Sequence, residues 1–125
     1  MTVIRRADQR RTSTPNAVMT THASPTQGAA MLAVWHVDMV AGAAGPRHTF
    51  DVEQVWTVLD GAAVVELDGH SLPVTPGDTI VLPAGVSRRV LSDPADGATF
   101  VVAAPGGARV STDDGREPFV PEWIL

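Results

Sequence analysis

Apolar and polar residues alternate over short stretches of this 125-residue chain, and turn-forming residues separate the stretches. Residues 30–40, AMLAVWHVDMV, are dense in large apolar side chains, with the polar His36 and Asp38 alternating with Val37. This alternation is typical of a strand with one face toward a core. No window shows the 3.6-residue apolar repeat of a capped amphipathic helix. The pattern therefore predicts an all-β chain with little helix.

Short strands are predicted along the rest of the middle of the chain, each ended by turn residues. Asp60-Gly61 and Asp68-Gly69 suit tight hairpin turns that need positive φ, so this part is predicted to form a meander. Many short strands with Gly/Pro turns are typical of a sandwich or a barrel. The predicted strands are residues 53–59, 62–67, 70–74, 79–82, 86–91 and 98–104.

The two ends of the chain have a different character. Residues 1–29 begin with an arginine-rich stretch and contain a short extended segment, which predicts an N-terminal arm or edge strand. Residues 105–125 are predicted to comprise a Gly-, Asp- and Pro-rich loop over residues 105–117 and a closing segment, PFVPEWIL. The closing segment is apolar enough to pack on the rest of the domain or across a subunit interface. The sequence therefore predicts one domain, with residues 30–104 as its sandwich or barrel.

Composition excludes several classes of function. The chain has no cysteine, so it can build neither a disulfide framework nor a thiolate site. Its net charge of -5 argues against a nucleic-acid-binding surface. No run approaches the length of apolar sequence that crosses a membrane, and no secretory h-region follows the basic start. We therefore expect a cytoplasmic protein that binds neither nucleic acid nor a membrane.

Four side chains of differing chemistry lie close together within residues 42–61. They are an imidazole, a phenyl ring, a carboxamide and an indole, spaced by two, four and two residues around one bend between strands. Because alternate residues of a strand share a face, they can converge on one interior. A ligand site is therefore predicted at His48, Phe50, Gln54 and Trp56.

The spacing of this segment and of a second, glycine-bounded segment resembles the two cupin motifs. The first motif, G-x5-H-x-H-x3-E-x6-G, is matched in spacing by Gly42, His48, Phe50, Gln54 and Gly61. The second, G-x5-P-x-G-x2-H-x3-N, is matched in spacing by Gly77, Pro83, Gly85, Arg88 and Ser92.

The resemblance is to small single-domain cupins and covers residues 30–104. It implies a double-stranded β-helix, a jelly-roll barrel whose mouth is the usual ligand site, and a homodimer. It also implies a metal, commonly iron, manganese, zinc or nickel, held by the histidines and the acid of the motifs.

The substitutions at the ligand positions argue against that metal. Only His48 remains, Phe50 offers no lone pair, Gln54 offers a weak neutral oxygen, and Arg88 carries donors and a fixed positive charge. A unit charge at 4 Å repels another by roughly 4 kcal/mol in a site of intermediate dielectric. We therefore expect no tightly bound metal and no cofactor at this position.

The remaining histidines leave an alternative open. A non-standard metal site can combine His48 and Gln54 with His36 if the strands have the right phase. The simpler interpretation is that His36 is an edge histidine bonded to backbone. His70, which follows the Asp68-Gly69 turn, is most simply a solvated hairpin residue.

The favoured hypothesis is a metal-independent enzyme for proton-transfer chemistry on a small organic metabolite, of the isomerase, cyclase or lyase type. His48 is the predicted base, and Arg88 with Gln54 would stabilise negative charge. The aromatic walls Phe50 and Trp56, with His36, are the predicted substrate-binding residues. Arg88 can instead form a salt bridge to an acid such as Glu53 or Asp51 at the rim. The alternatives are a non-catalytic ligand-binding protein and a metal-dependent cupin.

Overall fold

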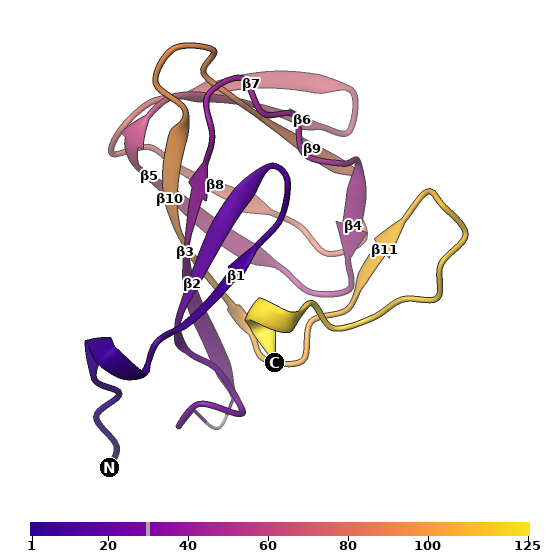
Figure 1. Ribbon diagram of the computed structural model, residues 1–125. Helices are drawn as coiled ribbons and strands as arrows, with labels where there is room; N and C mark the ends of the chain where they lie inside the picture. Colours follow the sequence, from indigo (N-terminus) through magenta and orange to yellow (C-terminus); the bar gives the residue numbers. More distant parts are fainter. Residues whose placement is uncertain (30) are drawn as a thin grey trace.

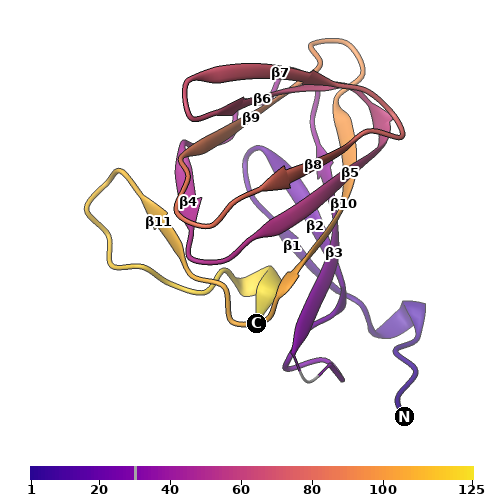
Figure 2. The same cartoon turned by 180° about the vertical axis from the view of Figure 1, so that it is seen from behind.

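The computed structural model describes residues 1–29 and 31–125, and it consists of two antiparallel sheets that face one another (Figures 1 and 2). The six-stranded sheet has the order β1-β2-β3-β10-β5-β8, and the five-stranded sheet has the order β11-β4-β9-β6-β7. The strands are β1 (Arg10–Ser13), β2 (Ala17–Ala23), β3 (Leu32–Met39), β4 (His48–Phe50), β5 (Gln54–Gly61), β6 (Ala63–Leu67), β7 (His70–Val74), β8 (Thr79–Leu82), β9 (Arg88–Ser92), β10 (Ala98–Pro105) and β11 (Val110–Thr112).

Helix is confined to two single turns of 3-10 helix in the described part of the chain, η1 (Arg6–Asp8) and η2 (Glu122–Ile124). No helix among the described residues is long and apolar enough to cross a membrane. The all-β class predicted from the hydrophobic pattern is confirmed, and so is the jelly-roll barrel that the motif resemblance implied. Each strand predicted between residues 53 and 104 has a counterpart, and the strand predicted at 30–40 is β3. Ala30, where that prediction starts, lies outside the described residues.

The predicted meander is wrong at one of its two turns. The Asp68-Gly69 pair does join the antiparallel partners β6 and β7, with both residues at positive φ. The Asp60-Gly61 pair, in contrast, carries the chain from β5 in the six-stranded sheet to β6 in the five-stranded sheet. Strand β5 pairs instead with β10 and β8, which are distant in sequence. A turn-forming dipeptide predicts that the chain reverses direction locally, but it does not predict which strands become hydrogen-bonded partners.

Gly61 stands at this crossing because the backbones approach closely there. Its φ is +73°, and a Cβ at this position would lie 2.1 Å from the carbonyl oxygen of Gly97. The Ala62 N–H donates to that same carbonyl at 3.1 Å. Only glycine supplies both the left-handed backbone and the space. This contact fixes how β5 leaves the first sheet and therefore which side chains of β5 face the barrel interior.

The core lies between the inner faces of the two sheets. Alternate residues of the central strands are buried there, among them Trp35 on β3, Val58 on β5 and Phe100 on β10. Each such side chain contributes roughly 1.5–3 kcal/mol by leaving water. The same alternation places every second residue of β4, β5 and β9 inside, which is what brings the predicted site residues together.

Both end segments are integrated into the barrel. Strands β1 and β2 extend the six-stranded sheet beside β3. Residues 105–117, predicted to be a loop, contain β11, which pairs with β4. At the C-terminal end, Ile124 of η2 is fully buried and the Thr21 hydroxyl donates to the Trp123 carbonyl at 2.7 Å. Residues near both ends of the chain therefore help to enclose the barrel interior.

Candidate functional site

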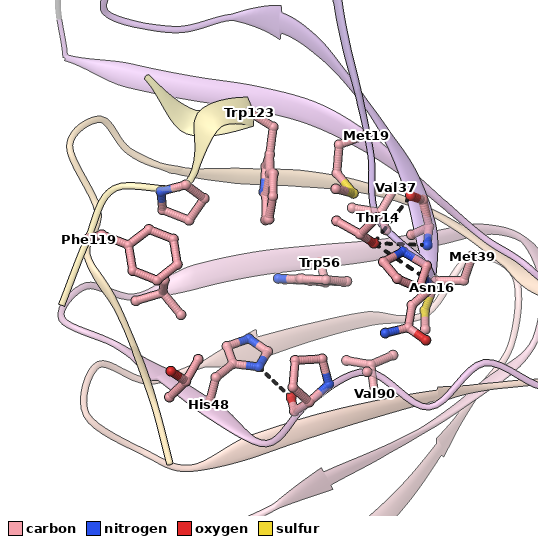
Figure 3. A pocket seen from close by; sticks show the side chains of 17 residues that line it. Thr14, Asn16, Met19, Val37, Met39, His48, Trp56, Val90, Phe119 and Trp123 are labelled. Carbon is pink, nitrogen blue, oxygen red and sulfur yellow. Dashed lines mark hydrogen bonds between the residues drawn. The ribbon is translucent and has the colours of Figure 1, made fainter. Parts of the chain in front are cut away.

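A cavity of about 310 Å³ opens between the two sheets (Figure 3). One wall comes from β2, β3 and β5 and the other from β4, β9, β11 and the loop before β4. The turn between β1 and β2 and the segment before and within η2 close its ends. The lining residues are Thr14, Pro15, Asn16, Ala17, Met19, Val37, Met39, Gly45, Pro46, His48, Trp56, Val90, Val110, Thr112, Phe119, Pro121 and Trp123.

His48 is held in one tautomer at the wall of this cavity. Its Nδ1 lies 2.7 Å from the carbonyl oxygen of Pro46, and because a carbonyl only accepts, Nδ1 carries the proton. The neutral ring therefore has its lone pair on Nε2, on the side toward the cavity in Figure 3. Burial lowers the pKa of His48, the bond to Pro46 opposes this, and the Arg88 cation lowers it further. The geometry is that of a neutral base at neutral pH.

Trp56 forms the middle of the cavity wall. Its indole Nε1 donates to Oε1 of Gln54 at 3.0 Å, and its ring meets Phe100 edge to face at a centroid distance of 5.0 Å. Such aromatic pairs are worth about 0.5–1.5 kcal/mol beyond area burial. The indole is therefore fixed in orientation from two sides.

Arg88 points into the barrel and is fully buried. Its Nη1 donates to Oε1 of Gln54 at 3.4 Å and its Nη2 to the Pro83 carbonyl at 3.0 Å, while the guanidinium carbon stands 5.4 Å from the centroid of Phe50. Burial lowers the pKa of Arg88 to about 10, so the group stays cationic at neutral pH. The alternative of a rim salt bridge to Glu53 or Asp51 is not what the structure has.

A comparison with protein-family models places the chain in a family. Residues 35–104, more than half of the chain, match the family described as Cupin domain. The chain belongs to the cupin family. Among solved structures, this cupin resembles the polyketide cyclase RemF from Streptomyces resistomycificus, with a TM-score of 0.76 and 22% identity over 98% of this chain and 88% of that one. No curated protein matches its sequence.

Two further solved structures share the architecture of this cupin. An RmlC-like cupin from Shewanella frigidimarina NCIMB 400 has a TM-score of 0.70 at 19% identity, covering 84% of this chain and 91% of that chain. KdgF from Halomonas sp. has a TM-score of 0.70 at 20% identity, covering 83% of this chain and 94% of that chain. At such identities the likeness establishes only the fold, so the activity of this cupin has to be inferred from its own residues.

The four motif positions of this cupin do not form a set of metal ligands. Phe50 has no donor atom, and the Arg88 guanidinium, which has no lone pair to offer, lies against Gln54. The Gln54 oxygen already accepts from Trp56 and Arg88, and its buried Nε2 has no partner among the described residues. No group of three or more His, Cys, Asp or Glu residues in the described part of the chain is placed to hold a metal.

His36 lies outside the cavity, so its predicted contact with substrate inside the barrel is wrong. It alternates with Trp35 and Val37 on β3, and these two face inward. The His36 ring instead accepts at Nδ1 from Nε2 of His22, whose Nδ1 is bonded to the Gln9 amide at 2.7 Å. The strand phase therefore also separates His36 from His48 and Gln54, the other members of the alternative metal site.

The predicted residues divide into two layers of this cupin. His48 and Trp56 line the cavity, whereas Phe50, Gln54 and Arg88 are buried behind them. The sequence reasoning missed several lining residues, because they come from segments with no motif and converge only through the fold. The apolar character of the C-terminal aromatic residues is visible in the sequence, but it predicts packing and not contact with a ligand. The missed lining residues include Asn16, Met19, Thr112, Phe119 and Trp123.

Proposed function

We propose that this cupin is a metal-independent enzyme that moves a proton on a small organic molecule, in isomerase, cyclase or lyase chemistry. The observation that carries the proposal is the His48 ring, with Nδ1 bonded to Pro46 and the Nε2 lone pair at the wall of a largely apolar cavity. A neutral base in such a site can accept a proton from carbon near neutral pH. The Nε2 atom takes a proton from a carbon next to a carbonyl, and the bonding electrons pass to the carbonyl oxygen as an enolate.

The second half of the reaction returns the proton. In an isomerisation the imidazolium of His48 delivers the proton to another carbon, and in an elimination it delivers the proton to a departing oxygen. In a cyclisation the enolate carbon attacks a second carbonyl, and the oxygen of that carbonyl receives the proton. Arg88, with Gln54, stabilises the negative charge that develops. Neither residue lines the cavity, so Arg88 acts through the field of its charge, and Gln54 holds Arg88 and Trp56 in position. Trp56 supplies the wall, and Phe50 supports His48 from behind.

The likeness to RemF supports the cyclase branch as the first to test, because that protein is a polyketide cyclase. The alternative function is a non-catalytic binder for the same class of molecule. It is favoured by the depth at which Arg88 and Gln54 lie behind the cavity wall.

The test is carbon-bound hydrogen exchange in D2O with 2-tetralone, a small bicyclic ketone whose acidic carbon protons lie beside its carbonyl. We expect the wild-type protein to accelerate deuterium uptake, measured by mass spectrometry, and His48→Gln to lower the rate by about 100-fold or more. His70→Ala, which changes an exposed imidazole on β7, is the matched control. Binding of 2-tetralone without any acceleration would favour the non-catalytic binder.

A homodimer and a cytoplasmic location are part of the proposal. The outer face of the six-stranded sheet exposes Leu59 and Val81, which supports a contact between two copies. The net charge of -5 supports a protein that does not bind nucleic acid. Light scattering at micromolar concentration tests the dimer, and a monomer would contradict it.

A further inference from the structure

The cavity has flat aromatic walls on more than one side. Trp56 lies at its centre, and Phe119 and Trp123 face it from the C-terminal segment (Figure 3). The thioethers of Met19 and Met39 fill the side toward β2 and β3, and such groups adapt well to the faces and edges of rings. Surfaces of this kind favour a flat, unsaturated ligand over a puckered one of the same volume. At about 310 Å³, the space is at the lower end for small-molecule sites.

The cavity offers no charged partner to a ligand. Of the side chains that line it within the described part of the chain, His48 alone is ionisable, and burial keeps it toward its neutral form. The nearest buried cation, Arg88, does not line the cavity, and its Nε, Nη1 and Nη2 donate to Val86, Gln54 and Pro83. Moving an ion from water into such a space without a partner is costly. The ground-state ligand is therefore best uncharged, and negative charge appears only after His48 has taken a proton.

One polar side chain of the lining is not accounted for by the reaction. Asn16 lies in the turn between β1 and β2, where the Thr14 hydroxyl accepts from the backbone N–H groups of Asn16 and Ala17 at 3.3 and 3.2 Å. These bonds fix the turn. The Asn16 carboxamide lies on the side of the cavity away from Phe119 (Figure 3). Within the described part of the chain Asn16 forms hydrogen bonds only through its backbone groups, so the donor and acceptor of its side chain can bond a ligand.

We propose that the cavity selects an uncharged, flat molecule of roughly two fused rings, with Asn16 bonding its polar substituent and Trp123 stacking on its ring system. Asn16 and Trp123 both lie outside residues 35–104, the part that matches the family, so the family motifs assign them no role, and here they act as specificity-determining residues. The inference rests on the proposed function, because it assigns a ligand class to the same cavity.

The ligand class is tested by calorimetric titration at pH 7 with three probes of similar size. The probes are 2-naphthol, which is flat and neutral, 2-naphthoate, which is flat and anionic, and decahydro-2-naphthol, which is neutral and puckered. We expect 2-naphthol to bind at least about tenfold more tightly than either of the others. Equal or tighter binding of 2-naphthoate or of decahydro-2-naphthol would overturn the selection, and so would no binding of 2-naphthol.

The residue assignments are tested by comparing 2-naphthol with naphthalene, which lacks the hydroxyl group. Asn16→Leu should lower the affinity for 2-naphthol about fivefold and leave the affinity for naphthalene unchanged, because the substitution removes only a hydrogen bond. Trp123→Leu should lower the affinity for both probes by about tenfold. If the Trp123→Leu protein does not fold, Phe119→Leu is measured in its place, with the same expected result. Thr57→Val, on the outer face of β5, is the matched control. An equal effect of Asn16→Leu on both probes, or no effect on either, would overturn the role of Asn16.

Failure of this inference can be told apart from failure of the proposed function. His48→Gln should lower the rate of deuterium exchange by about 100-fold or more while 2-naphthol still binds, because His48 acts on the reacting carbon. If 2-naphthol binds as expected but no exchange is found, the ligand class holds and the enzyme proposal falls. If exchange proceeds while 2-naphthoate binds more tightly than 2-naphthol, the enzyme proposal holds and the neutral ligand class falls.

Discussion

Arg88 and Gln54 meet inside the barrel, with Nη1 of the guanidinium 3.4 Å from Oε1 of the carboxamide. Both residues occupy positions at which the cupin motif implies metal ligands, and here they bond to each other. The same Gln54 oxygen accepts from the Trp56 indole and so connects the buried cation to the cavity wall. Arg88 on β9 is the register partner of His48 on β4. A permanent positive charge is therefore fixed beside His48.

The first prediction concerns this charge and the base. Because the Arg88 cation contributes to the lowered pKa of His48, Arg88→Met should move the midpoint of the pH–rate profile for 2-tetralone exchange upward. In the wild-type protein the rate should rise with pH to a plateau, with a midpoint below about 6.5, the ordinary value for histidine. Arg109→Met, which changes an exposed arginine that does not line the cavity, is the control. A profile that is identical in wild type and Arg88→Met would remove Arg88 from this role.

The second prediction concerns stability. The pKa of His48 is lowered in the folded protein, so below about pH 6.5 the unfolded chain binds a proton that the folded chain does not. The free energy of unfolding should therefore fall as the pH drops below 6.5, until the pH passes the folded-state pKa. His48→Gln should make this decline shallower in urea titrations between pH 7 and 5. His22, whose pKa is also lowered by burial, should contribute to the decline that remains.

The third prediction concerns the crossing between the sheets. Gly61→Ala places a methyl group against the Gly97 carbonyl at a positive φ, and it should lower the free energy of unfolding by about 3 kcal/mol. Gly69→Ala is the matched control, because its φ of +78° is similar and nothing lies within 4 Å of the new methyl. That control should cost only about 1 kcal/mol. Equal losses for the two variants in urea unfolding would show that the close approach at Gly61 does not matter.

The fold was largely predictable because its strands are short, alternate regularly and end at Gly and Pro. Pairing was predictable only where a turn joins neighbours, as at Asp68-Gly69. At Asp60-Gly61 the partner strands come from distant parts of the sequence, and a local signal contains no information about them. The loop expected after Pro105 contains β11 for the same reason, since its partner β4 lies far away in the chain.

The site was predictable as far as the motif spacing reached. His48, Phe50, Gln54 and Arg88 do converge, because alternate residues of β4, β5 and β9 face the interior. Spacing could not tell which of them reach the cavity and which form the layer behind it. His36 was placed in the site because the phase of β3 relative to the motif strands was unknown. The lining residues from both ends, such as Asn16 and Trp123, became visible only once the chain was folded.

The most direct test of the account is the metal content of the purified protein, measured by inductively coupled plasma mass spectrometry after incubation with iron, zinc, manganese and nickel and then dialysis. Because a guanidinium and a phenyl ring stand at two of the motif's ligand positions, we expect no metal to be retained near one equivalent, and 2-tetralone exchange to be unaffected by a chelator. One equivalent of a metal that is retained by the wild-type protein and lost in His48→Ala would contradict the account.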